Sequence, residues 1–133
     1  MAALLTAPRR LRVAALILVA GAGALLLVRD QPAGAASGKT VKLSADAQGK
    51  LKFNTTKLTT THGRVTVVMS NPKGSGIPHG IAVEGHGLDK DGKTANPGST
   101  STVTLTLKKG TYDFYCPVDG HRAAGMKGKL VVR

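Results

Sequence analysis

The segments that follow residue 36 alternate apolar and polar residues, and this pattern constrains the fold more than any other feature of the chain. Residues 103–107 show it most cleanly, with Val103, Leu105 and Leu107 on one face, and a period of two is typical of a half-buried β-strand. No amphipathic helical run of useful length occurs after residue 36. Strands are expected at residues 41–43, 50–55, 65–70, 80–84, 103–107, 111–116 and 129–132.

Turn-forming residues separate these segments, so the expected strands are short and numerous. Residues 59–63 are expected to form a turn, and residues 85–100, rich in glycine, aspartate and asparagine, a long loop. About seven short strands with regular turns predict an all-β chain, specifically an antiparallel Greek-key β-sandwich. If the strands that begin at His79 and end at Cys116 are neighbours in the core, both side chains emerge at the same end of the sandwich.

The first 36 residues differ sharply from the rest. Three arginines at positions 9, 10 and 12 precede an uncharged run of 16 residues at 13–28, and a small-residue sequence follows at 33–35. This arrangement predicts a secretory signal peptide. An uncleaved anchor helix, associated with the membrane through residues 11–28, stays open as well, because a spanning helix needs about 17–25 residues.

Either interpretation divides the chain into a leader at residues 1–36 and a domain at residues 37–133. The domain is expected at the periplasmic or extracytoplasmic face of the membrane, because positive charge stays on the cytoplasmic side. It contains 15 Lys and Arg against six Asp and Glu, a net charge of +9. Such a charge steers a protein towards acidic partners or anionic membrane surfaces. The lysines form no block, so a generally solvated surface explains them equally well.

Nucleic acid is not an expected partner of this basic domain. The chain has no helix-turn-helix pattern, no zinc-finger spacing and no RNA-binding aromatic motif, and these are the features that accompany basic charge in such proteins. Export from the cytoplasm argues in the same direction.

Cys116 is the only cysteine, so no intrachain disulfide is possible. In an exported chain a single cysteine calls for an intermolecular bridge, a reactive thiol or a metal ligand. His121 follows five residues later and Met126 five residues after that. Two histidines, one cysteine and a weak axial methionine form the blue-copper electron-transfer pattern. With His79 upstream, these four residues are predicted to bind one copper ion; singly, Cys116 and Met126 would also suit core packing.

The surroundings of these residues extend the pattern. Pro78 precedes the upstream histidine, an aromatic strand at 112–115 precedes the cysteine, and residues 128–132 close the chain. Taken together, residues 40–133 resemble the cupredoxin family, the small blue copper proteins such as plastocyanin and azurin. The Cys-x4-His-x4-Met spacing is most similar to that of auracyanin and rusticyanin. The resemblance implies a seven- or eight-stranded Greek-key sandwich with the same four copper ligands.

The chain departs from the family pattern at three positions. Gly80 stands where many members have an asparagine whose side chain ties the two ligand loops together, so this tie is missing or replaced. Asp119 stands where a proline often precedes the glycine-histidine pair. Pro117 removes a backbone N–H donor beside the cysteine. We expect these positions to change the reduction potential relative to other members.

The resemblance implies a one-electron carrier that cycles between Cu(I) and Cu(II), and not an enzyme. Multicopper oxidases and copper nitrite reductases need further histidines, and only His62 and His86 are spare. A binuclear copper site needs two cysteines. Copper delivery without a redox role is the alternative, because the same ligands would serve it.

The ligand His121 lies in the middle of its loop, and its edge is expected to reach solvent. We expect a monomeric domain whose redox partner is an acidic protein, such as a cytochrome or a membrane redox complex. Lys73 and Lys127 are candidates for steering such a partner. Small apolar residues around His121 would let it approach closely: Ile77, Pro78, Pro117, Val118, Ala123 and Ala124.

Overall fold

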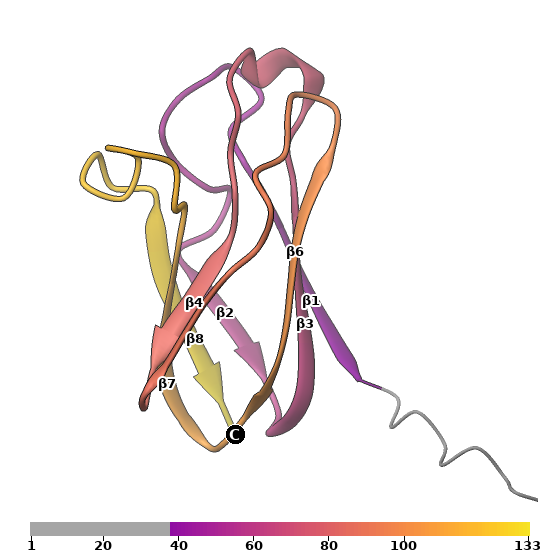
Figure 1. Ribbon diagram of the computed structural model, residues 1–133, viewed down its shortest axis with the longest axis vertical. Coiled ribbons are helices and arrows are strands. Elements are labelled where there is room, and N and C mark those ends of the chain that lie inside the picture. Colours follow the sequence, from indigo (N-terminus) through magenta and orange to yellow (C-terminus); the bar gives the residue numbers. More distant parts are fainter. Residues whose placement is uncertain (1–37) are drawn as a thin grey trace, which may run out of the picture. The chain divides into compact units, whose positions relative to one another are not determined.

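Two β-sheets packed face to face form the domain in this computed structural model, which describes residues 38–133 (Figure 1). The predicted leader at residues 1–36 lies outside the described residues. The smaller sheet has the strand order β1 (Lys39–Ser44), β3 (Gly63–Ser70) and β6 (Thr100–Leu107). The larger sheet has the order β2 (Lys57–Thr60), β8 (Lys127–Val132), β7 (Gly110–Tyr115), β4 (Ala82–Gly85) and β5 (Leu88–Asp91).

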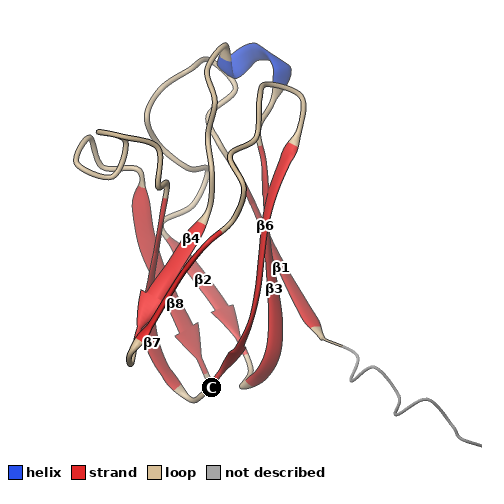
Figure 2. Cartoon of the chain, in the orientation of Figure 1, coloured by secondary structure: helices blue, strands red, loops and turns tan. Residues whose placement is uncertain are grey.

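Strands and loops make up nearly all of the described domain, as Figure 2 shows. A short 3-10 helix, η1 (Lys73–Ser75), interrupts the connection between β3 and β4. No helix within residues 38–133 has the length and apolar character that crossing a bilayer requires. The all-β prediction is therefore confirmed for this part of the chain.

Two strand pairs are parallel, which corrects the expectation of an antiparallel sandwich. β1 runs parallel to β3, and β2 runs parallel to β8. β1 and β2 belong to different sheets, so the segment between them crosses the sandwich and no hairpin sets the direction of either strand. The pairs β3–β6, β4–β5, β4–β7 and β7–β8 are antiparallel as expected.

Three further expectations about the strands were wrong. Residues 50–55 do not form a strand, because only Phe53 makes an isolated bridge, to Ala45, while its ring enters the core. Residues 57–60, which overlap the expected turn, form β2, with Leu58 and Thr60 buried. The expected long loop at residues 85–100 contains β5, whose four residues are all exposed and so lack an alternating pattern.

The hydrophobic core lies between the two sheets and follows the alternation of the sequence. In β3 the buried side chains are Val65, Val67 and Met69, as the pattern predicts. The aromatic rings of Phe53 and Phe114 meet with their centroids 5.7 Å apart. Further buried side chains, all but Ile81 from strands, complete this core: Leu43, Ile81, Val83, Val103, Leu105, Leu107, Tyr112, Leu130 and Val132.

Candidate metal centre

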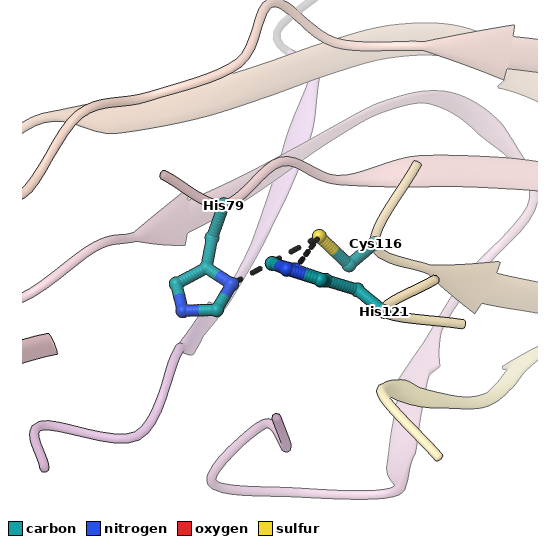
Figure 3. A group of neighbouring side chains, drawn as sticks. All are labelled: His79, Cys116 and His121. Atoms are coloured by element: carbon teal, nitrogen blue, oxygen red, sulfur yellow. Dashed lines mark hydrogen bonds between the residues drawn. The ribbon is translucent and has the colours of Figure 1, made fainter. Parts of the chain in front are cut away.

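Three of the four predicted ligands come together at one end of the sandwich. His79 lies between η1 and β4, Cys116 directly follows β7, and His121 lies in the loop between β7 and β8. One donor atom from each lies within 4.8 Å of the other two. Figure 3 shows both imidazole rings and the thiol converging. β4 begins at Ala82 rather than at His79, but β4 and β7 are neighbours, so the expected meeting of the two ligands occurs.

The spacing of these donors fits a small metal ion. The Cys116 Sγ atom lies 3.4 Å from Nδ1 of His121 and 4.0 Å from Nδ1 of His79. A divalent ion about 2 Å from nitrogen and about 2.3 Å from sulfur requires donors roughly 3.5–4 Å apart. Two imidazoles and one thiolate are also the donor set that suits copper. Within residues 38–133, His79, Cys116 and His121 are the cluster of His, Cys, Asp or Glu side chains whose donor atoms lie close enough to hold a metal ion.

The fourth predicted ligand, Met126, is fully buried and joined to the other two loop ligands through the backbone. The Cys116 N–H donates to the Met126 carbonyl at 3.0 Å, and the Met126 N–H donates to the His121 carbonyl at 3.1 Å. Gly120 and Gly125 precede the histidine and the methionine with φ values of 76° and 105°, a conformation that glycine adopts without strain. The loop therefore folds back so that its start and end are adjacent.

His79 and His121 differ in their access to solvent. His79 is fully buried, and its Nε2 has no hydrogen-bond partner among residues 38–133. Burial and, second, the charge of His121 lower the pKa of His79, which favours the neutral form of the ring that a metal requires. His121 is partly exposed, as expected for a residue in the middle of its loop.

The Cys116 thiol is fully buried in the same centre. Burial raises the pKa of Cys116, while backbone N–H groups of Gly80 and Val118 act in the opposite direction. The Gly80 N–H donates to Sγ at 3.3 Å. Because the thiolate is the metal ligand, metal binding must displace the thiol proton. The Gly80 backbone thus joins the two ligand segments although its side chain is absent.

Gly80 and Pro117, two of the departures from the family pattern, are in contact. A Cβ atom at Gly80 would lie 3.1 Å from Cδ of Pro117, closer than a relaxed carbon–carbon contact. The proline ring therefore occupies space that a longer side chain at position 80 would need. Gly80 and Pro117 therefore pack as a pair, and nothing in the sequence alone indicated that the two positions are related.

The buried side-chain amide of Asn71 positions the segment that carries His79. Asn71 donates to the carbonyls of Ile77 at 2.9 Å and Ala95 at 2.8 Å, and accepts from the Ser75 hydroxyl at 2.6 Å. His79 and Ala95 exchange two backbone hydrogen bonds. Asn71 therefore links the segment before His79 to the segment that pairs with it. The sequence feature that could have indicated this role is an asparagine that directly follows a core strand and precedes a proline.

Replacing Asn71 with alanine is expected to lower the free energy of unfolding by about 2–3 kcal/mol, because it removes the three hydrogen bonds that the Asn71 amide makes to Ile77, Ala95 and Ser75. The variant should also release copper faster, since the segment carrying His79 loses its anchor. Urea unfolding of the metal-free protein and copper release to a chelator measure the two effects. Asn96→Ala, at an exposed position nearby, is the matched control. Equal effects of the two substitutions would contradict this role of Asn71.

The remaining candidate residues lie at or near the surface of the domain. His62 and His86 are exposed: His62 contacts the Arg133 carbonyl, and the His86 ring lies 4.7 Å from that of Tyr112. Neither belongs to the metal group. Lys73 and Lys127 are exposed. The proposed patch residues are all exposed or partly exposed: Ile77, Pro78, Pro117, Val118, Ala123 and Ala124.

A β-sandwich that holds two imidazoles and one thiol at one end defines a small copper protein. The sequence model of the copper binding proteins of the plastocyanin/azurin family matches residues 39–133. The chain therefore belongs to the plastocyanin/azurin copper-binding family, and copper is its cofactor. The resemblance to the cupredoxins that the ligand spacing indicated is confirmed.

Individual relatives agree with this assignment. A stretch of 56 residues is 43% identical to plastocyanin A'/A'' of Nicotiana tabacum, covering 42% of this chain and 54% of that protein. The chain thus matches about half the length of this curated relative. Auracyanin B has a TM-score of 0.63 at 24% identity, over 71% of this chain and 88% of its own.

A second solved structure, the dithionite-reduced auracyanin of the photosynthetic bacterium Roseiflexus castenholzii, also has a TM-score of 0.63. It is 23% identical over 72% of this chain and 98% of its own. At such low identity these structural likenesses establish the fold.

Proposed function

We propose that this protein is a one-electron carrier whose copper is held by His79, Cys116, His121 and Met126 and cycles between Cu(I) and Cu(II). The observation that supports this most directly is the convergence of a buried thiol and two imidazoles from separate parts of the fold. Family membership supports copper as the metal. The arrangement matches the His2Cys pattern with a weak axial ligand that is typical of blue-copper electron transfer.

The protein contributes a fixed set of donors, and bound copper supplies the reversible one-electron change. His79 and Cys116 are both fully buried and come from different segments of the fold, so their positions depend on sandwich packing rather than on the ion. Dense packing limits side-chain movement, and electron transfer would then need little rearrangement. The Gly80 N–H, which donates to Sγ, stabilises negative charge on the sulfur.

His121 is the proposed route for the electron to the partner. Its ring is partly exposed, whereas His79 is buried. Exposed Pro78, Ala123 and Ala124 are small and would let a partner come close. An acidic partner, such as a cytochrome or a membrane redox complex, would be attracted by the net charge of +9 on residues 37–133, which raises association rates. We propose that the domain acts as a monomer in this encounter.

We further propose that the domain works outside the cytoplasm, at the outer face of the membrane. The arginine-flanked apolar run at residues 13–28 supports this location. In Figure 1, β1 starts at the end of the sandwich away from the loop between β7 and β8.

Electron self-exchange and copper transfer distinguish an electron carrier from a copper-delivery protein. We expect mixtures of the Cu(I) and Cu(II) proteins to exchange electrons rapidly, as NMR line broadening measures, while copper stays on each molecule. Isotopically labelled copper, mixed with unlabelled metal-free protein, reports transfer of the ion. Faster transfer of the ion than of the electron would favour delivery and contradict the proposal.

A further inference from the structure

Arg122, the residue after His121, reaches out of the ligand loop to the larger sheet. Its guanidinium forms a two-pronged ion pair with Glu84: Nη1 donates to Oε2 at 3.0 Å, and Nη2 donates to Oε1. The guanidinium carbon also lies 3.9 Å from the centre of the Tyr115 ring. The Tyr115 hydroxyl donates to the Asp89 carboxylate at 3.1 Å. The guanidinium of Arg122 is therefore held by two contacts: hydrogen bonds to the Glu84 carboxylate and stacking on the Tyr115 ring.

These contacts join the segments that carry three of the proposed ligands. Glu84 lies in β4, the strand that follows His79, and Tyr115 is the residue immediately before Cys116. Within residues 38–133, Arg122 makes the side-chain hydrogen bonds that connect loop residues 117–125 to a strand. The other hydrogen bonds of this loop are local backbone turns or contacts to the candidate ligands.

An ordinary surface ion pair would not orient a loop, because exposed ion pairs contribute little to stability. The side chains of Arg122 and Glu84 are 42% and 29% exposed. Their two parallel hydrogen bonds, however, fix a direction as well as a distance, and stacking on an aromatic ring restricts the guanidinium further. The contact is thus suited to orienting the loop, whatever its effect on overall stability.

We propose that Arg122 and Glu84 form a clamp that holds His121 in its metal-binding position, replacing the side-chain tie that glycine at position 80 cannot supply. Both are positioning residues, and this inference rests on the ligand assignment proposed above. The clamp lies on the sheet side of the loop, whereas Gly80 packs against Pro117. Without it, the loop would sample other orientations, and the copper would dissociate more readily.

Two neutralising substitutions separate this clamp from a simple effect of charge. Arg122→Gln removes a positive charge near copper, and Glu84→Gln removes a negative one. If only charge mattered, the two variants would change copper release in opposite directions. The clamp predicts that both accelerate copper release about tenfold, the low end of the range for residues that support metal ligands. Arg122→Lys should not restore the slow rate, because lysine lacks the planar fork.

The pair formed by Lys129 and Asp113 provides a matched control on the same sheet. Its atoms lie 2.7 Å apart and its side chains are 61% and 38% exposed. Asp113 pairs with Glu84 across β4 and β7, so this pair places charge beside the clamp while its own ion pair joins β7 to β8 and not to the ligand loop. Lys129→Gln and Asp113→Asn should therefore release copper at the wild-type rate. Release is measured with the full chain by transfer of copper to a chelator, and the Cu(II) electron paramagnetic resonance spectrum reports the ligand geometry.

The clamp is supported if both Arg122→Gln and Glu84→Gln release copper faster and alter the Cu(II) spectrum while circular dichroism stays unchanged. Wild-type release with an unaltered spectrum in these variants would overturn it, as would opposite shifts in the two. The charge-exchanged double variant, Arg122→Glu with Glu84→Arg, should partly restore slow release, so a loss of folding in one single variant does not decide the result. If wild-type protein fails to bind copper at all, the proposed function fails instead.

Discussion

Serine at position 116 is expected to abolish the intense visible absorption of the copper-loaded protein. This absorption arises from charge transfer between a thiolate and copper, and a serine hydroxyl has neither the polarisable sulfur nor the accessible negative charge of a thiolate. The Cys116 sulfur lies next to both histidines. Because the chain has a single cysteine, no other thiolate can replace it. The measurement is the visible spectrum of purified Cys116→Ser after addition of Cu(II), compared with the wild type.

Two further variants show whether the loss is specific to the thiolate. Met126→Leu should retain the band, although shifted, because the axial thioether is a weak ligand and leucine has a similar volume. His86→Gln should leave the spectrum unchanged, since His86 packs on Tyr112 away from the metal group. A full-intensity band in the Cys116→Ser protein would refute the assignment of the sulfur ligand.

Phe114→Ala is expected to produce the largest loss of stability, about 3–5 kcal/mol in the free energy of unfolding. Its ring is fully buried, meets Phe53 at 5.7 Å, and packs so closely on Gly128 that no side chain fits there. Alanine would leave a cavity between the two sheets. Since domains of this size are stable by only about 5–15 kcal/mol, the variant should unfold at much lower urea concentration. Urea unfolding of the metal-free protein measures the loss.

Two comparisons test the cavity explanation. Phe114→Leu should cost less than Phe114→Ala, because leucine fills part of the space. Thr111→Ala, at an exposed position of the same strand, should change stability by no more than about 0.5 kcal/mol. If Phe114→Ala is no more destabilising than Thr111→Ala, Phe114 does not hold the sheets together. Copper adds stability because it binds the folded state, so all three variants are compared without metal.

The sequence predicted those strands whose alternation matches their burial. Val65, Val67 and Met69 in β3, and Leu105 and Leu107 in β6, are buried where the pattern places them. The prediction failed where a buried residue lies outside a strand, or where a strand has no buried residues. Phe53 enters the core from a segment outside the strands, and β5 pairs with β4 although its residues are exposed. Local pattern reports burial, whereas pairing depends on which strands become neighbours.

In the candidate site, too, some residues could be predicted from the sequence and others could not. The residue types at positions 116, 121 and 126 and their regular spacing are enough to indicate a copper loop, because ligand chemistry is a property of the side chains. Asn71 gave no comparable signal. Its amide bonds to Ile77 and Ala95, and the importance of those contacts depends on the path of two loops that meet only in the folded domain.

By itself, the sequence determined the all-β character, the donor groups of the metal centre and the order in which they occur along the chain. Tertiary structure alone decided that β4 and β7 are neighbours, which brings His79 to Cys116 and places Glu84 opposite Arg122. The physical reason is range: alternation and ligand spacing are local properties of a few residues. The meeting of His79 with Cys116, 37 positions apart, depends on packing of the whole sandwich.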